Sequence, residues 1–313
     1  MNEQHDVKPM RVAVLGATGQ VGTPLAHGLL ANGHKVVAIT RGRSARNEAK
    51  LRALEELGAE LAFCEDLSDV DGLAPLLEGC EVLVASVAAE ETFLVEVQPK
   101  VLEAAIKAGV KRFVPNEFGA HTQGLPMGAG VVFDHKKRFQ EKLFASGLDW
   151  TLYYNGGIFD YFLPNLRFFE KITTFGDLDL PLYTHHVRDI GAVAALAVVD
   201  PRAAKRCVQV DYNVLSQRQM LELLKQCWPD YPFEYQHYST EYIVRMKEEA
   251  GDEVSAKQGA ETDKERWGIN YVCYVAGKLA TFNDITLRAT ELYPDYQCIK
   301  PIEMLQDPTF VFE

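Results

Sequence analysis

The chain lacks several features that would place it in particular protein classes. Its six cysteines form no C-x-x-C pair, so the sequence predicts neither a disulfide framework nor a zinc site, and no other metal-ligand spacing is present. No apolar run reaches the ~18 residues of a membrane span, and the polar start MNEQHDVKP has no signal-peptide core. The formal net charge of −12 argues against nucleic acid or an anionic membrane as the main partner. These absences predict a cytoplasmic protein without a metal.

The overall composition is that of an ordinary globular protein. The 313 residues are 47% hydrophobic and 24% charged, which is enough for one extended α/β domain plus a smaller addition.

The segment 10–43 carries a glycine motif within a strand-turn-helix-strand pattern. Gly16, Gly19 and Gly22 follow a short apolar strand and precede an amphipathic helix, and the strand 35–40 closes the unit. Gly16 permits a tight turn, Gly19 lets the backbone approach a pyrophosphate, and Gly22 lets the helix lie close to the sheet. The motif predicts a dinucleotide site, which also includes Thr18, Gln20 and Val21.

The residue after the second strand indicates which dinucleotide binds. An NAD site places Asp or Glu there, whereas this chain has Arg41, followed by Arg43, Arg46 and Lys50. A guanidinium group suits a ribose 2′-phosphate, although Arg46 and Lys50 also fit a solvated helix face. The sequence therefore predicts NADP(H).

Strand and helix patterns continue to alternate, which predicts a doubly wound parallel sheet with its ligand at the carboxyl ends of the strands. Helices are expected at 44–57, 71–77 and 93–108, and strands at 60–63, 82–85 and 112–115. The rim residues predicted to contact the cofactor are Ser86, Val87, Asn116 and Phe118. We expect a Rossmann domain at 1–157, to which a late strand near 183–212 returns. A smaller, mainly helical substrate-binding part is expected at 158–182 and 213–313.

The middle and end of the chain are less regular. The glycine-rich segment 118–130 is predicted to be a mobile loop, followed by a helix at 131–147 and a strand at 149–154. Aromatic residues at 159–175 fit either core packing or a flat pocket for an aromatic substrate. Helices are expected at 216–227 and 240–249, and the polar stretch 248–266 is predicted to be an exposed loop.

The helix at 131–147 places a lysine on its apolar face. Lys136 lies near the centre of an arc formed by Val132, Phe133, Phe139, Leu143 and Phe144. The lysine either extends to solvent along its methylene groups or projects into a dry pocket, where desolvation would make it a general acid or base. Other candidates are weaker: the Tyr-x-x-x-Lys pairs Tyr274/Lys278 and Tyr296/Lys300, and the histidines His121, His135, His185 and His186.

Several motifs in this order resemble one family. GATGQVG, ITRGR, KRFVPNEFG, FDHKKRFQEKL, LDWTLYYNGGIFDYFLP and VRDIGAVAALAVVDP are similar to the NmrA-like, isoflavone reductase-like atypical short-chain dehydrogenases. The resemblance implies that Lys136 is catalytic and that Arg41 and Lys50 contact the 2′-phosphate. It also implies an NADPH-dependent reductase of phenolic compounds, or a regulator that binds the dinucleotide without turnover.

The chain departs from the plant pattern in two places. Asn116 replaces a serine, and Asn155-Gly156 replaces a Ser-Asn pair near the nicotinamide, which affects the expected substrate more than the cofactor. We predict that Asn155 and Lys136 contact the cofactor. The predicted substrate-binding residues are His121, Tyr154, Phe159 and Phe162.

Three functional hypotheses remain open at this point. The leading one is reduction of a phenolic, isoflavonoid-like or polyketide-like aromatic molecule by NADPH, with Lys136 handling a proton. The alternatives are an NADP-binding redox sensor that docks onto a protein, and a non-redox isomerase. The sequence is compatible with a homodimer and does not decide the assembly.

Overall fold

Short apolar segments build one large parallel sheet. The computed structural model describes residues 8–253, 262–280, 282–310 and 312. The sheet has eight strands in the order β13-β10-β6-β5-β4-β1-β2-β3, and every neighbouring pair is parallel. The strands are β1 (Arg11–Leu15), β2 (Lys35–Thr40), β3 (Glu60–Phe63), β4 (Val82–Ala85), β5 (Arg112–Val114), β6 (Asp149–Tyr154), β10 (Arg206–Gln209) and β13 (Thr286–Arg288).

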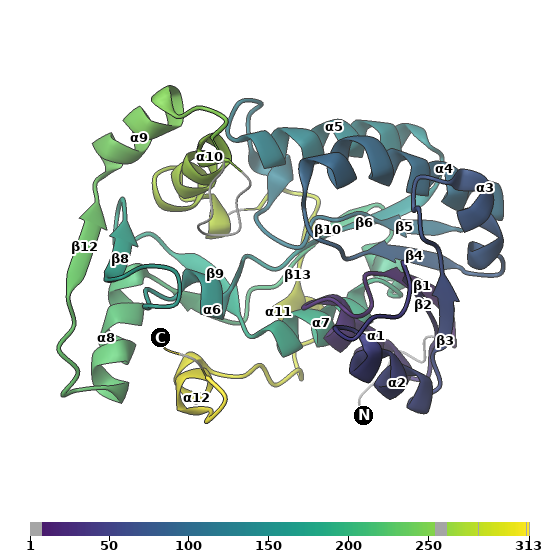
Figure 1. Ribbon diagram of the computed structural model, residues 1–313, viewed down its shortest axis with the longest axis horizontal. Coiled ribbons are helices and arrows are strands. Elements are labelled where there is room, and N and C mark those ends of the chain that lie inside the picture. Colours follow the sequence, from purple (N-terminus) through teal and green to yellow (C-terminus); the bar gives the residue numbers. More distant parts are fainter. Residues whose placement is uncertain (1–7, 254–261, 281, 311, 313) are drawn as a thin grey trace.

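Helices cover both faces of this sheet (Figure 1). One face carries α3 (Val70–Leu73), α4 (Gln98–Ala108) and α5 (Val131–Ala145), and the other carries α1 (Gly22–Ala31), α2 (Glu48–Glu56) and α7 (Val187–Ala197). Alternate residues of β1 serve the two cores, because Val12 and Val14 pack on one side and Ala13 and Leu15 on the other. The predicted doubly wound sheet is confirmed.

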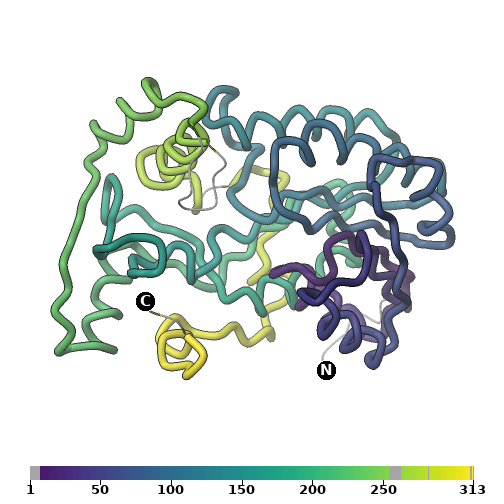
Figure 2. Tube along the Cα trace, viewed as in Figure 1, coloured from purple at the N-terminus to yellow at the C-terminus, as the bar shows by residue number. Residues whose placement is uncertain are grey.

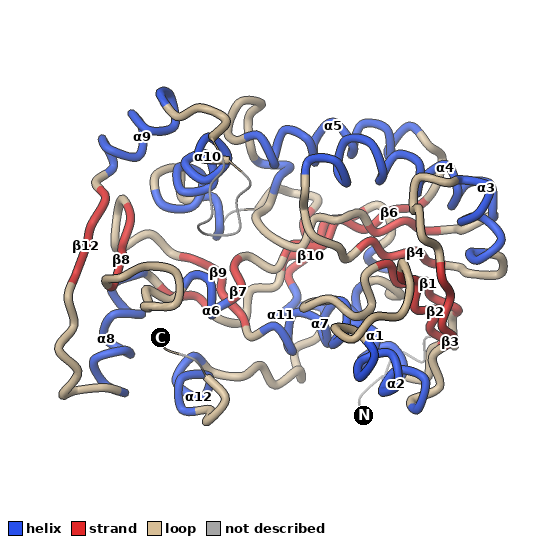
Figure 3. The backbone as a smooth tube through the Cα atoms, in the orientation of Figure 1, coloured by secondary structure: helices blue, strands red, loops and turns tan. Residues whose placement is uncertain are grey.

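The remaining elements lie beyond the carboxyl side of the sheet (Figures 2 and 3). They include two small sheets that the sequence did not predict, β11-β9-β7 and β12-β8. Their strands are β7 (Gly157–Ile158), β8 (Ile172–Phe175), β9 (Leu182–His185), β11 (Val214–Leu215) and β12 (Tyr235–Tyr238). The helices there are α6 (Phe159–Phe162), α8 (Gln217–Cys227), α9 (Thr240–Glu249), α10 (Asp263–Tyr274) and α12 (Pro301–Gln306). Helix α11 (Ala289–Leu292) instead packs in the same core as α1 and α7. The predicted division into two parts stays a prediction.

Three helix predictions need correction. The helix expected from Ser44 begins at Glu48, because the Ser44 N–H donates to the Asn47 side chain over 2.7 Å and forms a turn instead. The helix expected at 93–108 starts with a π-helical turn, Phe93–Val97. Phe144 is not part of the buried arc: its side chain is 41% exposed and packs on Trp150, 4.6 Å between ring centroids.

Two loop predictions also need correction. The segment 118–130 contains a 3-10 helix, Thr122–Gly124, and His121, Thr122 and Leu125 are buried. The polar stretch 248–266 is helical at both ends, in α9 and α10, and its residues 254–261 lie outside the described residues. Within the described ranges, no helix has the length and apolar character to cross a membrane.

Candidate active site

The carboxyl ends of the central strands surround a cleft of about 730 Å³. Strand order reverses between β1 and β4, which is where doubly wound sheets bind ligands. The volume falls within the ~300–1,000 Å³ of small-molecule sites. Predicted residues that line the cleft are Gly16, Thr18, Gly19, Gln20, Val21, Arg41, Ser86, Val87 and Phe118. Arg43 of the predicted basic cluster and Ala88 of the predicted rim also line the cleft. The lining residues that no motif predicted are Ile39, Thr40, Gly42, Ser44, Asn47 and Leu67.

Two glycines shape the turn under this cleft by close backbone contact. Gly16 has φ of +77°, and a Cβ atom there would lie 2.1 Å from the Ser86 carbonyl oxygen. A Cβ atom on Gly22 would lie 2.0 Å from the Gly16 carbonyl oxygen. The first glycine therefore lets β1 turn beside β4, and the second lets α1 begin against that turn.

Further contacts hold the loop above these glycines. The Gly19 N–H donates to the Gly16 carbonyl at 2.8 Å, and the Lys50 ammonium of α2 donates to the Thr18 carbonyl, also at 2.8 Å. Tyr161 of α6 donates its hydroxyl hydrogen to Gln20 at 3.0 Å. Lys50 thus lies at the loop, although it does not line the cleft.

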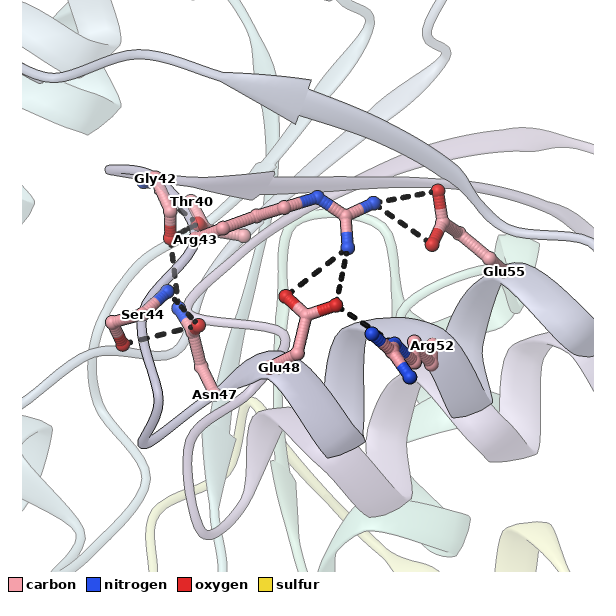
Figure 4. A network of polar contacts seen from close by, with 8 residues as sticks. All are labelled: Thr40, Gly42, Arg43, Ser44, Asn47, Glu48, Arg52 and Glu55. Carbon is pink, nitrogen blue, oxygen red and sulfur yellow. Dashed lines mark hydrogen bonds and ion pairs between the residues drawn. The ribbon is translucent and has the colours of Figure 1, made fainter.

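Arg41 and Arg43 both line the cleft, but among the described residues carboxylates neutralise only Arg43. Figure 4 shows the network around Arg43. Arg43 binds the carboxylates of Glu48 and Glu55 at 3.1 and 2.9 Å, and Glu48 also binds Arg52 at 2.8 Å. Two positive and two negative charges cancel in this network. Arg41 is exposed and lines the cleft, so it is the better candidate for an added phosphate group.

A second cavity of about 290 Å³ adjoins Arg41. It shares Arg41, Leu67, Val87 and Ala88 with the large cleft, and Glu65, Asp66, Glu90, Phe93 and Val97 complete it. Residues 65–67 follow the end of β3 after one further residue, Cys64. Their position at a strand end was the sequence signal that could have assigned them to the rim.

The ends of β5 and β6 extend the rim. Asn116 and Asn155 are 4% and 1% exposed, and the Asn116 amide donates to the Ala88 carbonyl at 3.4 Å. The Asn155 side-chain oxygen has no hydrogen-bond partner among the residues that the structure describes. Phe118 lines the cleft with an unusual φ of 24°. Gly156 has φ of +67°, and a side chain there would meet the Tyr183 carbonyl at 2.2 Å, so this backbone requires glycine at position 156.

Lys136 is buried in α5 with only 7% of its surface exposed. Its ammonium donates to the backbone carbonyl of Glu117, which immediately precedes Phe118 at the cleft. Burial lowers the pKa of Lys136, while the carboxylates of Glu117 and Glu265 oppose that shift. The lysine does not extend to solvent, and it ends beside the rim.

The four predicted substrate-binding residues lie behind the rim. His121 and Tyr154 are buried with ring centroids 4.4 Å apart, and the His121 ring bonds Thr286 at 2.7 Å. Phe159 is fully buried, and Phe162 packs on Tyr274 at 6.2 Å. Their predicted role in substrate binding stays a prediction.

Comparison with known proteins agrees with this architecture. A model of the NmrA-like family matches residues 8–300. The chain belongs to the NmrA-like family. The resemblance read from the sequence motifs is thereby confirmed.

Named relatives extend the comparison of this NmrA-like chain. Isoeugenol synthase 1 from Petunia hybrida is 26% identical over 315 residues, which cover 95% of this chain and 92% of that protein. The structure of AtPrR2 with NADP+ and (+)pinoresinol aligns with a TM-score of 0.80 at 24% identity, over 96% of this chain and 98% of the other. The leucoanthocyanidin reductase–NADPH complex from Vitis vinifera gives 0.78 at 20%, over 95% and 98%. These structures show the shared fold.

The other candidates of this NmrA-like chain have structural partners. Tyr296 donates to the Asp189 carboxylate at 2.7 Å, and Tyr274 is buried among aromatic rings. His135 lies 3.3 Å from Glu91, and His186 caps α7. Among the described residues, no three His, Cys, Asp or Glu side chains form a group that could hold a metal.

His185 gives a testable pH dependence of stability. Its Nδ1 bonds the Asn155 carbonyl at 3.0 Å and its Nε2 accepts the Asn213 N–H at 3.1 Å, so the ring holds one proton. Burial lowers the pKa of His185 to about 4, below the ordinary ~6.5 of an unfolded histidine. A lowered folded-state pKa means that stability is complete above pH ~6.5 and falls between ~6.5 and ~4, by up to ~3 kcal/mol.

Urea unfolding at pH 7 and pH 4.5 tests this prediction. The fall in unfolding free energy should shrink by ~2 kcal/mol in His185→Gln and persist in the neighbouring His186→Gln. Part of the fall in unfolding free energy should remain in His185→Gln, because burial also lowers the pKa of His121 to about 4. An unchanged difference in His185→Gln would contradict the assignment.

Proposed function

We propose that this protein is an NADPH-dependent reductase of a small aromatic molecule. The observation that carries the proposal is the buried Lys136 ammonium, which bonds the Glu117 carbonyl directly beside the cleft residue Phe118. A dinucleotide cleft alone would serve a sensor equally well. Proton transfer to a substrate needs a group such as a desolvated lysine, and we infer that the nicotinamide binds at the Phe118 end of the cleft, beside Lys136.

The residues of the cleft fit NADP(H). Gly16 and Gly22 hold a turn into which no side chain fits, and α1 begins there with no acidic residue in its first turn. That helix end attracts the pyrophosphate, and Arg41 takes the 2′-phosphate, with Lys50 near the loop. The named relatives with NADP+ and NADPH support the same cofactor.

The residues of this chain orient the cofactor and the substrate and control the proton that reaches the substrate oxygen. When bound, the nicotinamide supplies the hydride. Lys136 stabilises the negative charge that develops on a substrate oxygen and delivers a proton to it, because burial has weakened its hold on that proton. The relatives named for isoeugenol, pinoresinol and leucoanthocyanidin support a phenolic substrate class.

The decisive experiment traces the hydride of NADPH into the product and does not rely only on the loss of NADPH absorbance. The protein is incubated with NADPH deuterated at the transferred position and with a panel of phenylpropanoid and flavonoid phenolics. We expect deuterium in one product. Tight NADPH binding with no deuterium transfer across the panel would favour the redox-sensing regulator, and substrate conversion without label would favour the isomerase.

Arg41 decides the cofactor preference. Arg41→Ala should weaken NADPH binding ~10–100-fold and leave NADH binding nearly unchanged, because hydrogen bonds to charged groups contribute ~1.5–3 kcal/mol. Arg43→Ala is the matched control, since that arginine lines the same cleft but is neutralised by Glu48 and Glu55. Calorimetric titration measures both. Equal losses for NADPH and NADH would refute the 2′-phosphate assignment.

A further inference from the structure

Glu117 is a buried acid that the sequence analysis assigned to no role. It follows β5, and 1% of its surface is exposed. Its backbone carbonyl accepts the hydrogen bond from Lys136, while its carboxyl oxygens accept from Gln140 at 2.7 Å and Thr122 at 3.0 Å. One residue therefore contacts the lysine through its backbone and holds a carboxyl group in the same dry region.

The side chains around this carboxyl group can all direct their donor hydrogens towards it. The Thr122 hydroxyl donates to Glu117, and its oxygen accepts from Gln140 at 2.7 Å and bonds the Tyr154 hydroxyl at 2.9 Å. An ionised carboxylate only accepts hydrogen bonds, whereas a protonated one must also donate. Gln140 and Thr122 can supply one donor to each oxygen, so the partners present can satisfy the charged form.

Helix α5 couples the two ionisable groups. Lys136 and Gln140 are four residues apart, so they lie on the same face of the helix. The first reaches the backbone of Glu117 and the second reaches its carboxylate. Burial raises the pKa of Glu117 and lowers the pKa of Lys136, and the charge of each partner opposes the shift in the other.

We propose that Glu117 is a positioning residue whose carboxylate is the counter-charge of Lys136 and sets the pH at which this lysine gives up its proton. The proposal rests on the proton-handling role of Lys136 put forward above. It explains why a charged amine is stable in a site with 7% exposure, because an unpaired ammonium there would lose its proton.

The other ionisable groups near this pair come from three elements. Glu265 of α10 is half-buried and is the second carboxylate that acts on Lys136. Tyr154 of β6 and Cys207 of β10 lie near Glu117. Burial raises the pKa of Cys207 to about 12 and that of Tyr154 well above its ordinary value, so both are neutral at working pH. Glu117 is therefore the buried counter-charge, and Glu265 supplies a matched control.

The sign of the effect follows from the charges. Glu117→Gln keeps the shape and removes the negative charge, so the ammonium loses its stabilisation and the pKa of Lys136 falls. An opposite charge within ~4–6 Å shifts a pKa by ~1–3 units, and the Glu117 charge raises the pKa of Lys136, so the titration midpoint of Lys136 should move ~1–3 pH units lower. The limb of the kcat/KM profile that depends on Lys136 should move the same way, whether the lysine acts as acid or base.

The test titrates the lysine directly in the NADPH complex. Protein with 13C-labelled lysine is followed by NMR, and Lys136→Met identifies the signal of Lys136. Glu117→Gln should lower the midpoint by the stated amount, while Glu265→Gln and Thr122→Val should lower it less. An unchanged midpoint in Glu117→Gln, or an equal shift in Glu265→Gln, would overturn the proposal.

A stability measurement covers the case in which Glu117→Gln folds poorly. Replacing Glu117 by Gln should cost much less stability when Lys136 is already replaced by Met, because no buried ammonium is then left unpaired. Equal losses in the two backgrounds would also overturn the proposal. Neither readout needs turnover, so an active Lys136→Met would refute the catalytic role of the lysine without deciding the role of Glu117.

Discussion

Lys136→Met should lower turnover ~10²–10⁴-fold while NADPH affinity and folding persist. Methionine keeps the length and apolar packing of the lysine stem but cannot hold or deliver a proton. The site around Lys136 is dry, so water is poorly placed to replace it. Stopped-flow measurement of NADPH oxidation with an identified substrate gives the rate, and calorimetry gives the cofactor affinity.

Two further variants distinguish proton transfer by Lys136 from a purely electrostatic role and from general damage to α5. Lys137→Met is the matched control, because this neighbouring lysine donates to the Leu125 carbonyl, and it should keep nearly full activity. Lys136→Arg should recover little activity, since arginine does not release its proton near neutral pH. Full NADPH-dependent turnover in Lys136→Met would disprove the catalytic assignment and redirect attention to His135 or Tyr154.

The framework of the site could be predicted because its signals are local. The apolar strand before Gly16, the glycine spacing and the strand that ends before Arg41 lie within one short stretch, and the structure places them at one rim. The position of Lys136 could also be predicted, because helical periodicity alone puts it between Val132 and Phe139. Its burial confirms that pattern.

Other features depend on contacts between distant segments. The partners of Glu117 lie 5 and 23 residues away, so no local motif marks its carboxylate as a counter-charge. The strands β8 and β12 are short and pair across about sixty residues, as with Thr173 and Gln236, so neither strand predicts the sheet by itself. From the sequence, Arg43 and Arg41 are equivalent candidates for binding the 2′-phosphate. The structure distinguishes them, because two carboxylates neutralise Arg43.

One error shows where helical periodicity loses precision. Phe144 lies eight residues after Lys136, which is two turns plus ~80° around the helix, at the edge of the buried arc. Close to the end of α5 that edge faces outward, and the ring packs on Trp150 instead of the core. Periodicity identifies the centre of a buried face more reliably than its margins.

Gly19→Val should abolish NADPH binding in a protein that still folds. Gly19 lines the cleft, and a Cβ atom there would lie 3.0 Å from the Gly16 carbonyl, a contact that small backbone shifts can relieve. The branched side chain would instead occupy the space that the pyrophosphate needs. Wild type at ~100 times the dissociation constant gains ~2.7 kcal/mol from NADPH, a rise in Tm of ~4 °C, and the variant should gain none.

Gly22→Ala gives the contrasting result that makes this prediction specific. Its Cβ atom would lie 2.0 Å from the Gly16 carbonyl oxygen, inside the fold and not on the cleft wall, so it should cost ~1–3 kcal/mol of stability. Thermal unfolding with and without NADPH therefore separates the two glycines. Gly19→Val loses the cofactor-induced rise, whereas Gly22→Ala lowers the Tm of the free protein. If Gly19→Val were still stabilised by NADPH, the pyrophosphate would not pass over this loop, and the cofactor assignment of the cleft would fail with it.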